Sequence, residues 1–456
     1  MHEPSSQKVV LAHGCFDVLH LGHKRHLEEA RALGDKLIVS ITPDHLINKG
    51  PGRPVFTAAQ RREMLLALEC VDDVVISETG DAAPIITQFK PAVYVKGIDY
   101  QGSDNPSLAN EIATVEAHGG RFHVTRSEKW SSSRIINGER LPEETLAYLE
   151  LARTRGAFDR IERTFERADK LNILFVGETI VDEYRYVRPL GKPSKEFILA
   201  TVEAGEAESF LGGVIAASLH ADWPRASVVT DDSQVLAKTR YVDVDFSRKL
   251  FEIYSRQRIE LTEERRAAFQ VKLIDGCRSA DVVICFDFGH GLMEAQERHI
   301  VEHAKFFAVN AQTNAGNAGF NPVTKYSRAD LVCVDEPEAR LAAKMQNERA
   351  VDDLARAISC DMDTLQIAIT RGRRGSAVWC GDDSIEIPSF ATKALDTIGA
   401  GDAFLAVAAP LVAAGLALEE AAFIGNVAGA IKTNIVGHRR HVGRAELLQA
   451  VEALLK

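Results

Sequence analysis

The stretch that decides the fold of the first part of the chain is HGCFDVLHLGH, residues 13–23. It follows the apolar run VVL at residues 9–11 and precedes residues with helical spacing, which predicts a turn between a β-strand and an α-helix. The free N–H groups and the dipole at a helix start favour a phosphate. His20 and His23, with Gly22 between them, can both donate to a nucleoside triphosphate and to charge developing at its α-phosphate. A phosphate site is therefore expected here.

Outward from this turn, β-rich runs alternate with amphipathic helical stretches as far as about residue 136. The expected strands are residues 9–11, 37–41, 74–76 and 92–95. This alternation predicts a Rossmann-like α/β domain over residues 1–141, followed by a helical connector over residues 142–170. A larger α/β domain is expected over residues 171–456. Its expected strands include residues 282–286, 331–334 and 365–369.

Length and composition narrow the class of protein. A chain of 456 residues with 46% hydrophobic and 26% charged residues is expected to form two or three soluble domains. A signal peptide and an apolar run long enough to span a bilayer are both lacking, so the expected location is cytoplasmic, with no membrane partner. The net charge of -11 argues against a nucleic-acid partner. Seven cysteines without C-x-x-C spacing argue against disulfides and a zinc site.

An HxGH pair on its own is at least as often an ordinary helix start as a nucleotide site. Here further motifs follow it in order: NKGPGRP at 48–54, QR at 60–61, VKGIDY at 95–100 and SSSR at 131–134. Together these motifs resemble the cytidylyltransferase-like nucleotidyltransferases. The resemblance implies that the catalytic residues are His20, His23 and Lys49. It implies nucleotide contacts by Gly14, Phe16, Asp17, Lys96, Gly97, Ser131, Ser132, Ser133 and Arg134.

The strongest motif of the second half is DTIGAGDAF, residues 396–404, where small residues at a helix start can form an anion hole beside a carboxylate. A bare Gly-Ala-Gly-Asp could be only a turn, but this string resembles the signature of ribokinase-type (PfkB) kinases. The resemblance implies that Asp402 is the catalytic base. It implies nucleotide contacts by Thr370, Gly372, Gly375, Gly399, Ala400 and Gly401, sugar contacts by Asp182, Gly212, Gly213 and Asp287, and an indirect metal contact by Glu338.

The second half also departs from the kinase pattern. The glycine pair is followed by VIAA at 214–217 without the usual asparagine, and the family's Asn-x-x-Glu stretch is DEPE at 335–338. The family's Asp-Pro-Lys stretch is NAQ at 310–312. Because the anion hole and the base persist, a changed acceptor fits better than a complete loss of chemistry. A catalytically weak sensor domain remains the alternative.

The motifs GRPV, QR and VKGIDY resemble the adenylyltransferase half of bifunctional heptose kinase/adenylyltransferases, in which the kinase domain comes first and not second as here. The first hypothesis is a bifunctional enzyme that uses Mg²⁺ and ATP, with CTP possible for the first domain. One domain would phosphorylate a sugar or sugar phosphate. The other would make a heptose-like ADP-sugar for lipopolysaccharide assembly. The second keeps only the transferase active and makes the other domain a ligand sensor or oligomerisation module. The expected partners are sugars and nucleotides, and a homodimer is a family-level expectation. A class I aminoacyl-tRNA synthetase ranks third, because no KMSKS-like loop is present.

Overall fold

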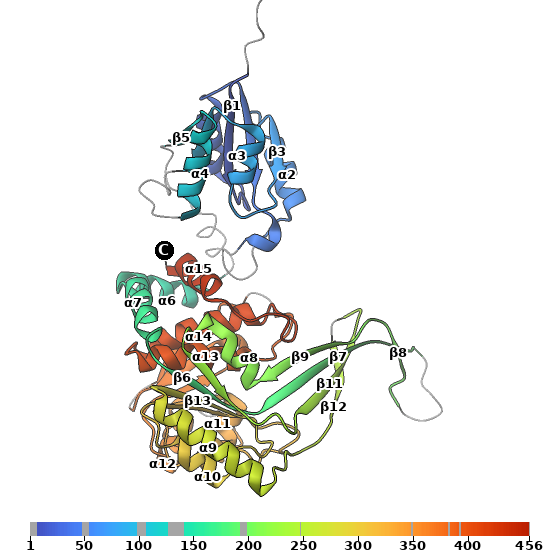
Figure 1. The fold of residues 1–456 in the computed structure, drawn as a ribbon, viewed down its shortest axis with the longest axis vertical. Coiled ribbons are helices and arrows are strands. Elements are labelled where there is room, and N and C mark those ends of the chain that lie inside the picture. Colours follow the sequence, from blue (N-terminus) through green and yellow to red (C-terminus); the bar gives the residue numbers. More distant parts are fainter. Residues whose placement is uncertain are drawn as a thin grey trace, which may run out of the picture. The chain divides into compact units, whose positions relative to one another are not determined.

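The structure is a computed structural model that describes residues 7–47, 54–97, 106–125, 141–191, 198–246, 248–347, 350–381, 384–391 and 394–455. The chain forms two compact units, Met1–Arg140 and Leu141–Lys456 (Figure 1). Lys49, Ser131, Ser132, Ser133 and Arg134 lie outside the described residues.

The first unit is built on a five-stranded sheet with the order β3-β2-β1-β4-β5, and every strand pair in it is parallel. Its elements are β1 Val9–Gly14, α1 Leu21–Arg31, β2 Lys36–Ile41, α2 Ala58–Leu66, β3 Asp73–Ile76, α3 Ala83–Phe89, β4 Val93–Lys96, α4 Pro106–Ala117 and β5 Arg121–Val124. The predicted strands near residues 9, 37, 74 and 92 are therefore confirmed as β1 to β4 of a parallel sheet.

Alternation along β1 gives this sheet two buried faces. Val10 and Ala12 belong to a core with Leu27 of α1 and Leu65 of α2. Leu11, one residue between them, belongs to a second core with residues of α3 and α4. A strand buried on both faces reads as a continuous apolar run, which is what the sequence shows. Because β1 is central, its carboxyl end places the following turn at the middle of the sheet edge, where ligands of open α/β sheets bind.

The second unit contains an eight-stranded sheet with the order β10-β6-β13-β14-β15-β16-β17-β18. The pairs from β10 to β16 are parallel, and β17 and β18 add an antiparallel edge. The strands are β6 Ile173–Gly177, β10 Ala226–Val229, β13 Val282–Asp287, β14 Phe307–Ala311, β15 Leu331–Asp335, β16 Ile367–Thr370, β17 Ser376–Trp379 and β18 Ser384–Ile387.

Helices cover both faces of this sheet. Phe175 and Phe286 face a core that includes helices near the chain's end, whereas Leu174 and Cys285 face a second core. The first group of helices is α6 Glu143–Thr154, α7 Ala157–Ala168, α8 Val214–Leu219, α13 Ala400–Ala413, α14 Leu418–Lys432 and α15 Arg444–Leu455. The second is α9 Glu263–Ser279, α10 Ala295–Val301, α11 Glu336–Ala342 and α12 Val351–Asp361. The unit is thus a three-layer α/β structure.

A second, smaller sheet extends from the body of this unit (Figure 1). Its order is β12-β11-β7-β8, and β9 also pairs with β7. The strands are β7 Thr179–Pro189, β8 Thr201–Glu203, β9 Glu208–Gly213, β11 Leu236–Asp243 and β12 Arg248–Tyr254. Asp182 and Tyr184 of β7, and Lys238 and Arg240 of β11, are buried. One face of this sheet therefore turns charged side chains toward the unit's interior.

The expected connector, residues 142–170, forms α6 and α7, which are part of the second unit's core. Leu149, Ile161 and Phe165 are buried there, and the Phe165 ring lies 5.6 Å from that of Trp223. α15 packs against both helices, and Arg153 of α6 donates to the Leu454 carbonyl oxygen at 2.8 Å. These helices are therefore more than a link between the units.

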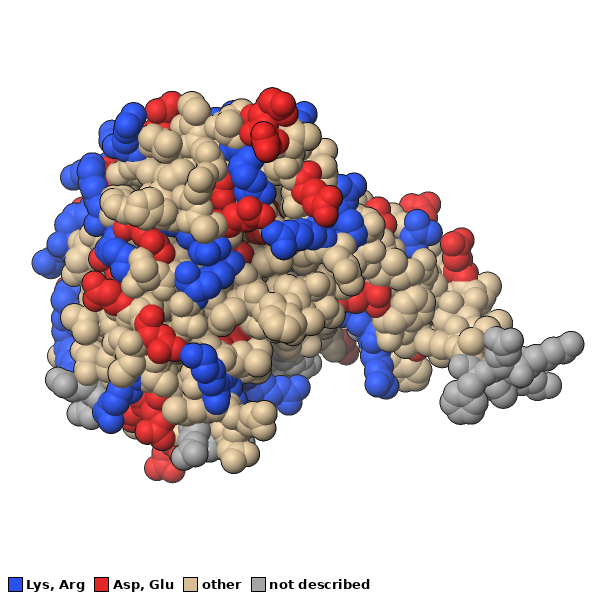
Figure 2. Space-filling model, turned by 90° about the horizontal axis from the view of Figure 1, so that it is seen from below, with Lys and Arg blue, Asp and Glu red and all other residues tan. Residues whose placement is uncertain are grey.

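Within the described residues, no helix is both long and apolar enough to cross a membrane. On the face shown in Figure 2, Lys and Arg side chains lie among Asp and Glu side chains, so the described part of that face gathers no broad area of one charge.

Removing the Phe165 ring should destabilise the second unit. We expect Phe165→Ala to lower its free energy of unfolding by about 3–5 kcal/mol, because a buried aromatic ring and its packing are lost. Urea unfolding followed by circular dichroism measures the change. Glu162→Ala, at an exposed position of the same helix, is the matched control. Equal stability of the two variants would contradict a core role for α7.

Candidate functional site

In the first unit, the turn after β1 carries the two histidines into the start of α1. His20 is the N-cap, and its Nδ1 accepts a hydrogen bond from the His23 backbone N–H at 3.3 Å. The two rings stack with centroids 3.8 Å apart. The capping bond explains why a histidine can stand here, since a side-chain acceptor satisfies one of the free N–H groups of the first turn. Both predicted catalytic histidines are thus brought together at a helix start.

A buried arginine fixes the shape of this turn. Arg61 of α2 is 0% exposed, and its Nη1 donates to the Cys15 carbonyl oxygen at 2.6 Å. Its Nη2 donates to the Thr42 carbonyl oxygen and to Asp44, and its Nε donates to the Phe56 carbonyl oxygen. One guanidinium therefore joins the ends of β1 and β2 to the start of α2.

Of the other expected nucleotide contacts, Asp17 and Phe16 form part of this turn. The Asp17 carboxylate accepts hydrogen bonds from the backbone N–H groups of Val55 and Phe56, at 2.7 and 3.0 Å. Phe16 has a φ of 47°, and its ring lies 3.0 Å from where a Cβ on Gly14 would be. These residues shape the turn, and the Asp17 carboxylate binds the backbone of the segment before α2.

Lys96 ends β4 beside the turn, and Gly97 follows it. The Lys96 ammonium lies 3.3 Å from the Glu111 carboxylate, and both side chains are buried. Glu111 also accepts hydrogen bonds from the Tyr94 hydroxyl at 2.7 Å and from the Ala82 N–H at 2.8 Å. Lys96 therefore forms a buried ion pair with Glu111. A nucleotide phosphate would have to share the Lys96 ammonium with this carboxylate.

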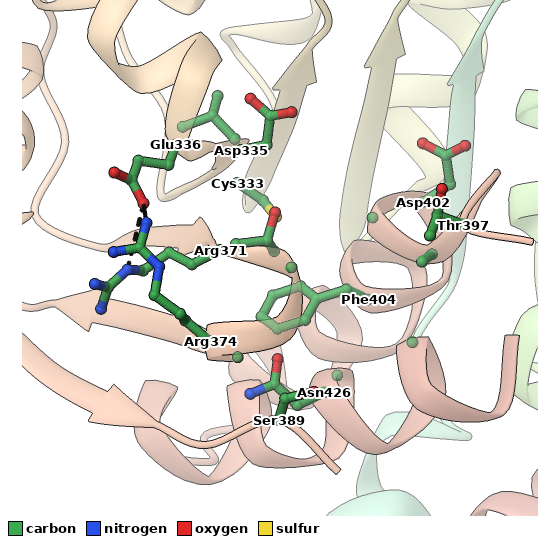
Figure 3. Close-up of a pocket in the computed structure, with 18 of the residues that line it drawn as sticks. Cys333, Asp335, Glu336, Arg371, Arg374, Ser389, Thr397, Asp402, Phe404 and Asn426 are labelled. Carbon is green, nitrogen blue, oxygen red and sulfur yellow. Dashed lines mark hydrogen bonds and ion pairs between the residues drawn. The ribbon is translucent and has the colours of Figure 1, made fainter. Parts of the chain in front are cut away.

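The second unit contains a cavity of about 860 Å³ at the carboxyl ends of β14, β15 and β16 (Figure 3). Its lining includes Thr370, Gly372, Gly375, Gly399, Ala400, Gly401, Asp402, Asp335 and Glu338. The predicted nucleotide-contacting residues of this unit, which are up to 31 residues apart in sequence, are thus brought to one cavity.

Asp402 lies in the first turn of α13 and faces this cavity. Its carboxylate accepts a hydrogen bond from the Gln312 side-chain amide at 2.9 Å. Burial raises the pKa of the Asp402 carboxyl to about 6, although the positive charges of His438 and Lys432 act in the opposite direction. A carboxylate with such a pKa is suited to accept a proton near neutral pH.

The turn that precedes Asp402 is shaped for an anion. Gly399 caps α13 with a φ of 74°, a conformation that glycine adopts without strain. The first-turn N–H groups of a helix lack intrahelical acceptors, so those near Gly401 are free to bind a phosphoryl group. Lys432 lies beneath the turn, buried, and donates to the Ile398 and Gly437 carbonyl oxygens at 2.7 Å.

A buried carboxylate, Asp396, anchors the turn to the smaller sheet. It accepts hydrogen bonds from Lys249 at 2.6 Å, from the Tyr184 hydroxyl at 2.8 Å and from the backbone N–H groups of Ile398 and Gly437. Burial alone would raise the pKa of Asp396, but these hydrogen bonds, chiefly that of Lys249, lower it to about 2. The turn is therefore held by an ionised group.

At the other side of the cavity, the TRGRRG turn brings arginines onto one carboxylate. Glu336 pairs with Arg340, Arg371 and Arg374, and Figure 3 shows the last two meeting it away from Asp402. Arg371 is nearly buried, whereas Arg374 is 57% exposed. Arg371 also pairs with Glu386 at 2.6 Å, so three guanidinium groups share two carboxylates at this end of the cavity.

Glu338 stands between these two sides. Its carboxyl oxygens accept hydrogen bonds from the backbone N–H groups of Asp335 at 2.9 Å and Thr313 at 3.1 Å. Burial and the nearby Asp335 raise the pKa of Glu338 to about 8, so a cation would favour its ionised form. No three described His, Cys, Asp or Glu side chains converge on one metal position. The residues fit a Mg²⁺ held mainly by nucleotide phosphates and water.

On the expected sugar side, Asp182 has protein partners already. Its carboxylate pairs with Arg240 and lies 3.1 Å from Nε2 of His438. Burial alone would raise the pKa of Asp182, but the His438 hydrogen bond and the charge of Arg240 lower it below its usual value. Gly212 and Gly213 end β9 beside this cluster, and a Cβ on Gly212 would clash with the Asp182 carboxylate.

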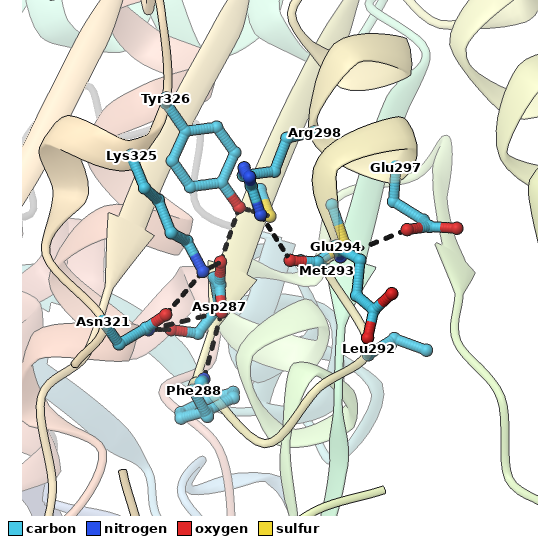
Figure 4. A network of polar contacts seen from close by, with 12 residues as sticks. Asp287, Phe288, Leu292, Met293, Glu294, Glu297, Arg298, Asn321, Lys325 and Tyr326 are labelled. Atoms are coloured by element: carbon cyan, nitrogen blue, oxygen red, sulfur yellow. Dashed lines mark hydrogen bonds and ion pairs between the residues drawn. The ribbon is translucent and has the colours of Figure 1, made fainter. Parts of the chain in front are cut away.

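Asp287, an expected sugar contact, has protein partners on both carboxylate oxygens. The side chain is 1% exposed, and one oxygen accepts from the Tyr326 hydroxyl at 2.7 Å and pairs with Lys325 (Figure 4). The other accepts from the Gly289 N–H at 3.0 Å and the Asn321 amide at 3.3 Å. With both oxygens engaged, Asp287 holds the following loop. The sugar contact expected of Asp287 stays a prediction.

Sequence reasoning missed several charged residues of this site: Lys238, Arg240, Lys249, Lys432 and His438. The sequence pattern around these residues gave little indication that they are buried in a site. Lys432 is a single lysine at the end of an otherwise apolar helix, and Lys238 and Arg240 alternate along one strand.

Two family models match the chain. Residues 11–138 match the cytidylyltransferase-like family, and residues 291–440 match the pfkB family of carbohydrate kinases. The chain joins a cytidylyltransferase-like domain to a pfkB-type domain. Both resemblances inferred from the sequence are therefore confirmed at the level of the family.

Similar curated proteins match the first of these domains. Two of them, both named bifunctional protein HldE, come from Pseudomonas syringae pv. syringae and Geobacter metallireducens. The first is 41% identical over 132 residues, which is 28% of this chain and 27% of the relative. The second is 38% identical over 134 residues, 29% of this chain and 26% of the relative. The match thus spans about a quarter of the relatives' length.

Among solved structures, the chain is similar to phosphofructokinase-2 from Escherichia coli, at 12% identity and a TM-score of 0.48, over 63% of this chain and 100% of that one. It is also similar to ribokinase from Giardia lamblia, at 18% identity and a TM-score of 0.48, over 62% of this chain and 98% of that one.

The Arg61 clamp gives a prediction for the first unit. Arg61→Met should lower the free energy of unfolding of this unit by about 3 kcal/mol or more, because several buried carbonyl oxygens lose their donor. Arg62→Met is the matched control, since Arg62 is exposed and donates once, to the Val74 carbonyl oxygen. Urea unfolding measures both. An Arg61 variant as stable as the control would show that the clamp does not hold the turn.

Proposed function

We propose that the chain is a bifunctional enzyme that transfers AMP from ATP to a sugar 1-phosphate, heptose-like, with release of pyrophosphate, and phosphorylates a sugar or sugar phosphate with ATP. The observation that carries the proposal is that His20 and His23 in the first unit, and Asp402 in the second, lie at helix starts, where free N–H groups favour phosphate. In the second unit, Asp402 stands beside an anion-binding turn in a nucleotide-sized cavity.

The transferase step needs stabilisation of charge at the α-phosphate. His20 and His23 stand at the start of α1, where ring and backbone N–H groups can donate to the oxygens on the pentacoordinate α-phosphorus as the sugar phosphate oxygen attacks. Pyrophosphate leaves as the new P–O bond forms. The motifs shared with heptose adenylyltransferases support ATP over CTP.

The kinase step uses the Asp402 carboxylate as base. It takes the proton of the acceptor hydroxyl while that oxygen attacks the γ-phosphorus of ATP, and ADP leaves. First-turn N–H groups near Gly401 stabilise the negative charge of the transferred group. A bound Mg²⁺ would neutralise phosphate charge, and Glu338 is the carboxylate that would help to hold it.

A second function is favoured by the acceptor side of this site. The Asp182 carboxylate already pairs with Arg240 and His438. In addition, the family's Asn-x-x-Glu stretch is replaced by DEPE at residues 335–338. In this alternative the second unit binds a nucleotide or sugar without turnover and regulates an active transferase.

Separate assays of pyrophosphate and ADP distinguish these functions. Mg-ATP or Mg-CTP would be tested against free sugars, sugar phosphates and sugar 1-phosphates. Pyrophosphate together with acceptor-dependent ADP supports the bifunctional enzyme, and pyrophosphate alone supports the sensor. Release of neither product would contradict both.

Loss of a preorganised donor should slow the transferase. We expect His23→Ala to lower the pyrophosphate release rate by about 10²-fold or more with folding intact. His118→Ala, at an exposed position just after α4, should retain the full rate. An unchanged rate in the His23 variant would overturn the assignment of the transferase site.

The kinase activity should be lost when the base, Asp402, is replaced, and it should fall at acid pH. Asp402→Asn should abolish acceptor-dependent ADP release, whereas Asp275→Asn, exposed on α9, should not. Because burial raises the pKa of Asp402 to about 6, the base is ionised above that pH, and kcat/KM should fall about tenfold per pH unit below it. A pH profile that stays flat down to pH 5 would exclude Asp402 as the base.

A further inference from the structure

Lys238 is a buried lysine that forms no ion pair within the described residues, although the charges of Asp182, Glu252 and Asp402 are near enough to oppose the lowering of its pKa by burial. It lies on β11, on the inner face of the smaller sheet, opposite Asp182 of β7 and Tyr254 of β12. Its side chain is 7% exposed, and its described contact is with the Tyr254 ring, 5.1 Å from the ammonium nitrogen. Among the described residues, no hydrogen bond or ion pair to a carboxylate is made by this ammonium group.

The neighbouring cations are all satisfied. Arg240, two residues along the same strand, pairs with Asp182. Lys249 pairs with Asp396 at 2.6 Å, and Lys432 donates to two carbonyl oxygens. A buried charge without a partner is costly, and proteins keep one where a ligand supplies the opposite charge.

A buried histidine with one unsatisfied nitrogen belongs to the same cluster. His290 is 0% exposed, and its Nδ1 lies 3.1 Å from the Gln257 carbonyl oxygen, to which it can only donate. Burial, and the charge of Lys238, lower the pKa of His290 to about 4, so the ring is neutral and Nε2 is an acceptor. In the described structure Nε2 has no hydrogen-bond partner.

The loop that carries His290 is fixed by a buried carboxylate. Glu178 accepts hydrogen bonds from the Phe288 N–H at 3.0 Å and the His290 N–H at 3.1 Å. Asp287 holds the start of the loop, and Gly289 turns it with a φ of 73°. His290 is therefore presented in one position before any ligand arrives.

Tyr254 and the loop after β14 connect this pair to the base. The Tyr254 ring lies 6.2 Å from the His290 ring, and a Cβ on Gly316 would lie 3.1 Å from His290 and 3.3 Å from Tyr254. Gln312, in the same loop, donates to Asp402. Lys238 is also close enough to Asp402 for each charge to shift the pKa of the other.

We propose that Lys238 and His290 form a subsite for an acceptor that carries both a negative charge and a hydroxyl group. Lys238 binds the charged group, a phosphate monoester or a carboxylate, and Nε2 of His290 accepts a hydrogen bond from a hydroxyl. This inference rests on the proposed kinase function, because it specifies the acceptor of the same site. It gives Arg240, which is neutralised by Asp182, no part in holding the charge.

The test compares neutral sugars with related acceptors that carry an anionic group. The full chain would be titrated calorimetrically with mannose, mannose 6-phosphate and mannonate, and with ribose and ribose 5-phosphate, and ADP release would be measured with each. We expect at least one anionic acceptor to bind more tightly than its neutral partner, and Lys238→Met to weaken that binding by about 10- to 100-fold. The phosphate and carboxylate arms identify which anion the site takes.

Lys272→Met, at an exposed position of α9, is the matched control and should bind like the unmodified chain. Without ligand, Lys238→Met should be at least as stable in thermal unfolding, because an unpaired buried charge is removed. A purely structural lysine would instead destabilise the protein when replaced. Stability therefore separates a ligand-binding role from a structural one.

Equal binding of neutral and charged acceptors, a charge preference that survives Lys238→Met, or no binding of any anionic acceptor would overturn the subsite. Lys238-dependent binding of an anion without ADP release would instead overturn the kinase function and leave the subsite standing.

Discussion

The acceptor side of the second unit depends on the ionised carboxylate of Asp396. It joins the turn before α13 to Lys249 and Tyr184 of the smaller sheet and to the backbone at Gly437. These segments come from three distant parts of the chain, so one buried anion sets the distance between the anion-binding turn and the residues around Lys238. Hydrogen bonds to a buried charge are stronger than neutral ones, and their loss is correspondingly expensive.

The local pattern of apolar residues in the sequence was sufficient to predict the strands of the two parallel sheets. Residues 9–11 and 282–286 are apolar runs buried on both faces, and they form β1 and β13. The smaller sheet was not predicted, because β7 mixes charged and aromatic residues and its pairing with β11 joins residues about 56 apart. Such pairing is determined by tertiary context, which outweighs local propensity in strands.

The candidate site was predictable where a motif fixes backbone shape. The turns around His20 and Gly399 could be placed because glycines and helix starts dictate where N–H groups point. The partners of individual side chains could not be predicted in this way. Asp287 stands in the expected loop but is engaged by Lys325 and Tyr326, which no local pattern links to it. Buried lysines escape prediction for the same reason, since sequence alone marks lysine as a surface residue.

The packing of α6 and α7 against α15 has a consequence for synthesis on the ribosome. The first helices of the second unit leave the exit tunnel early, but the residues that cover Phe165, among them Arg444, are translated nearly 280 residues later. Their apolar faces stay only partly covered during that interval, at an elongation rate of about 5–20 residues per second. The core around α6 and α7 is therefore complete only after α15 has been synthesised.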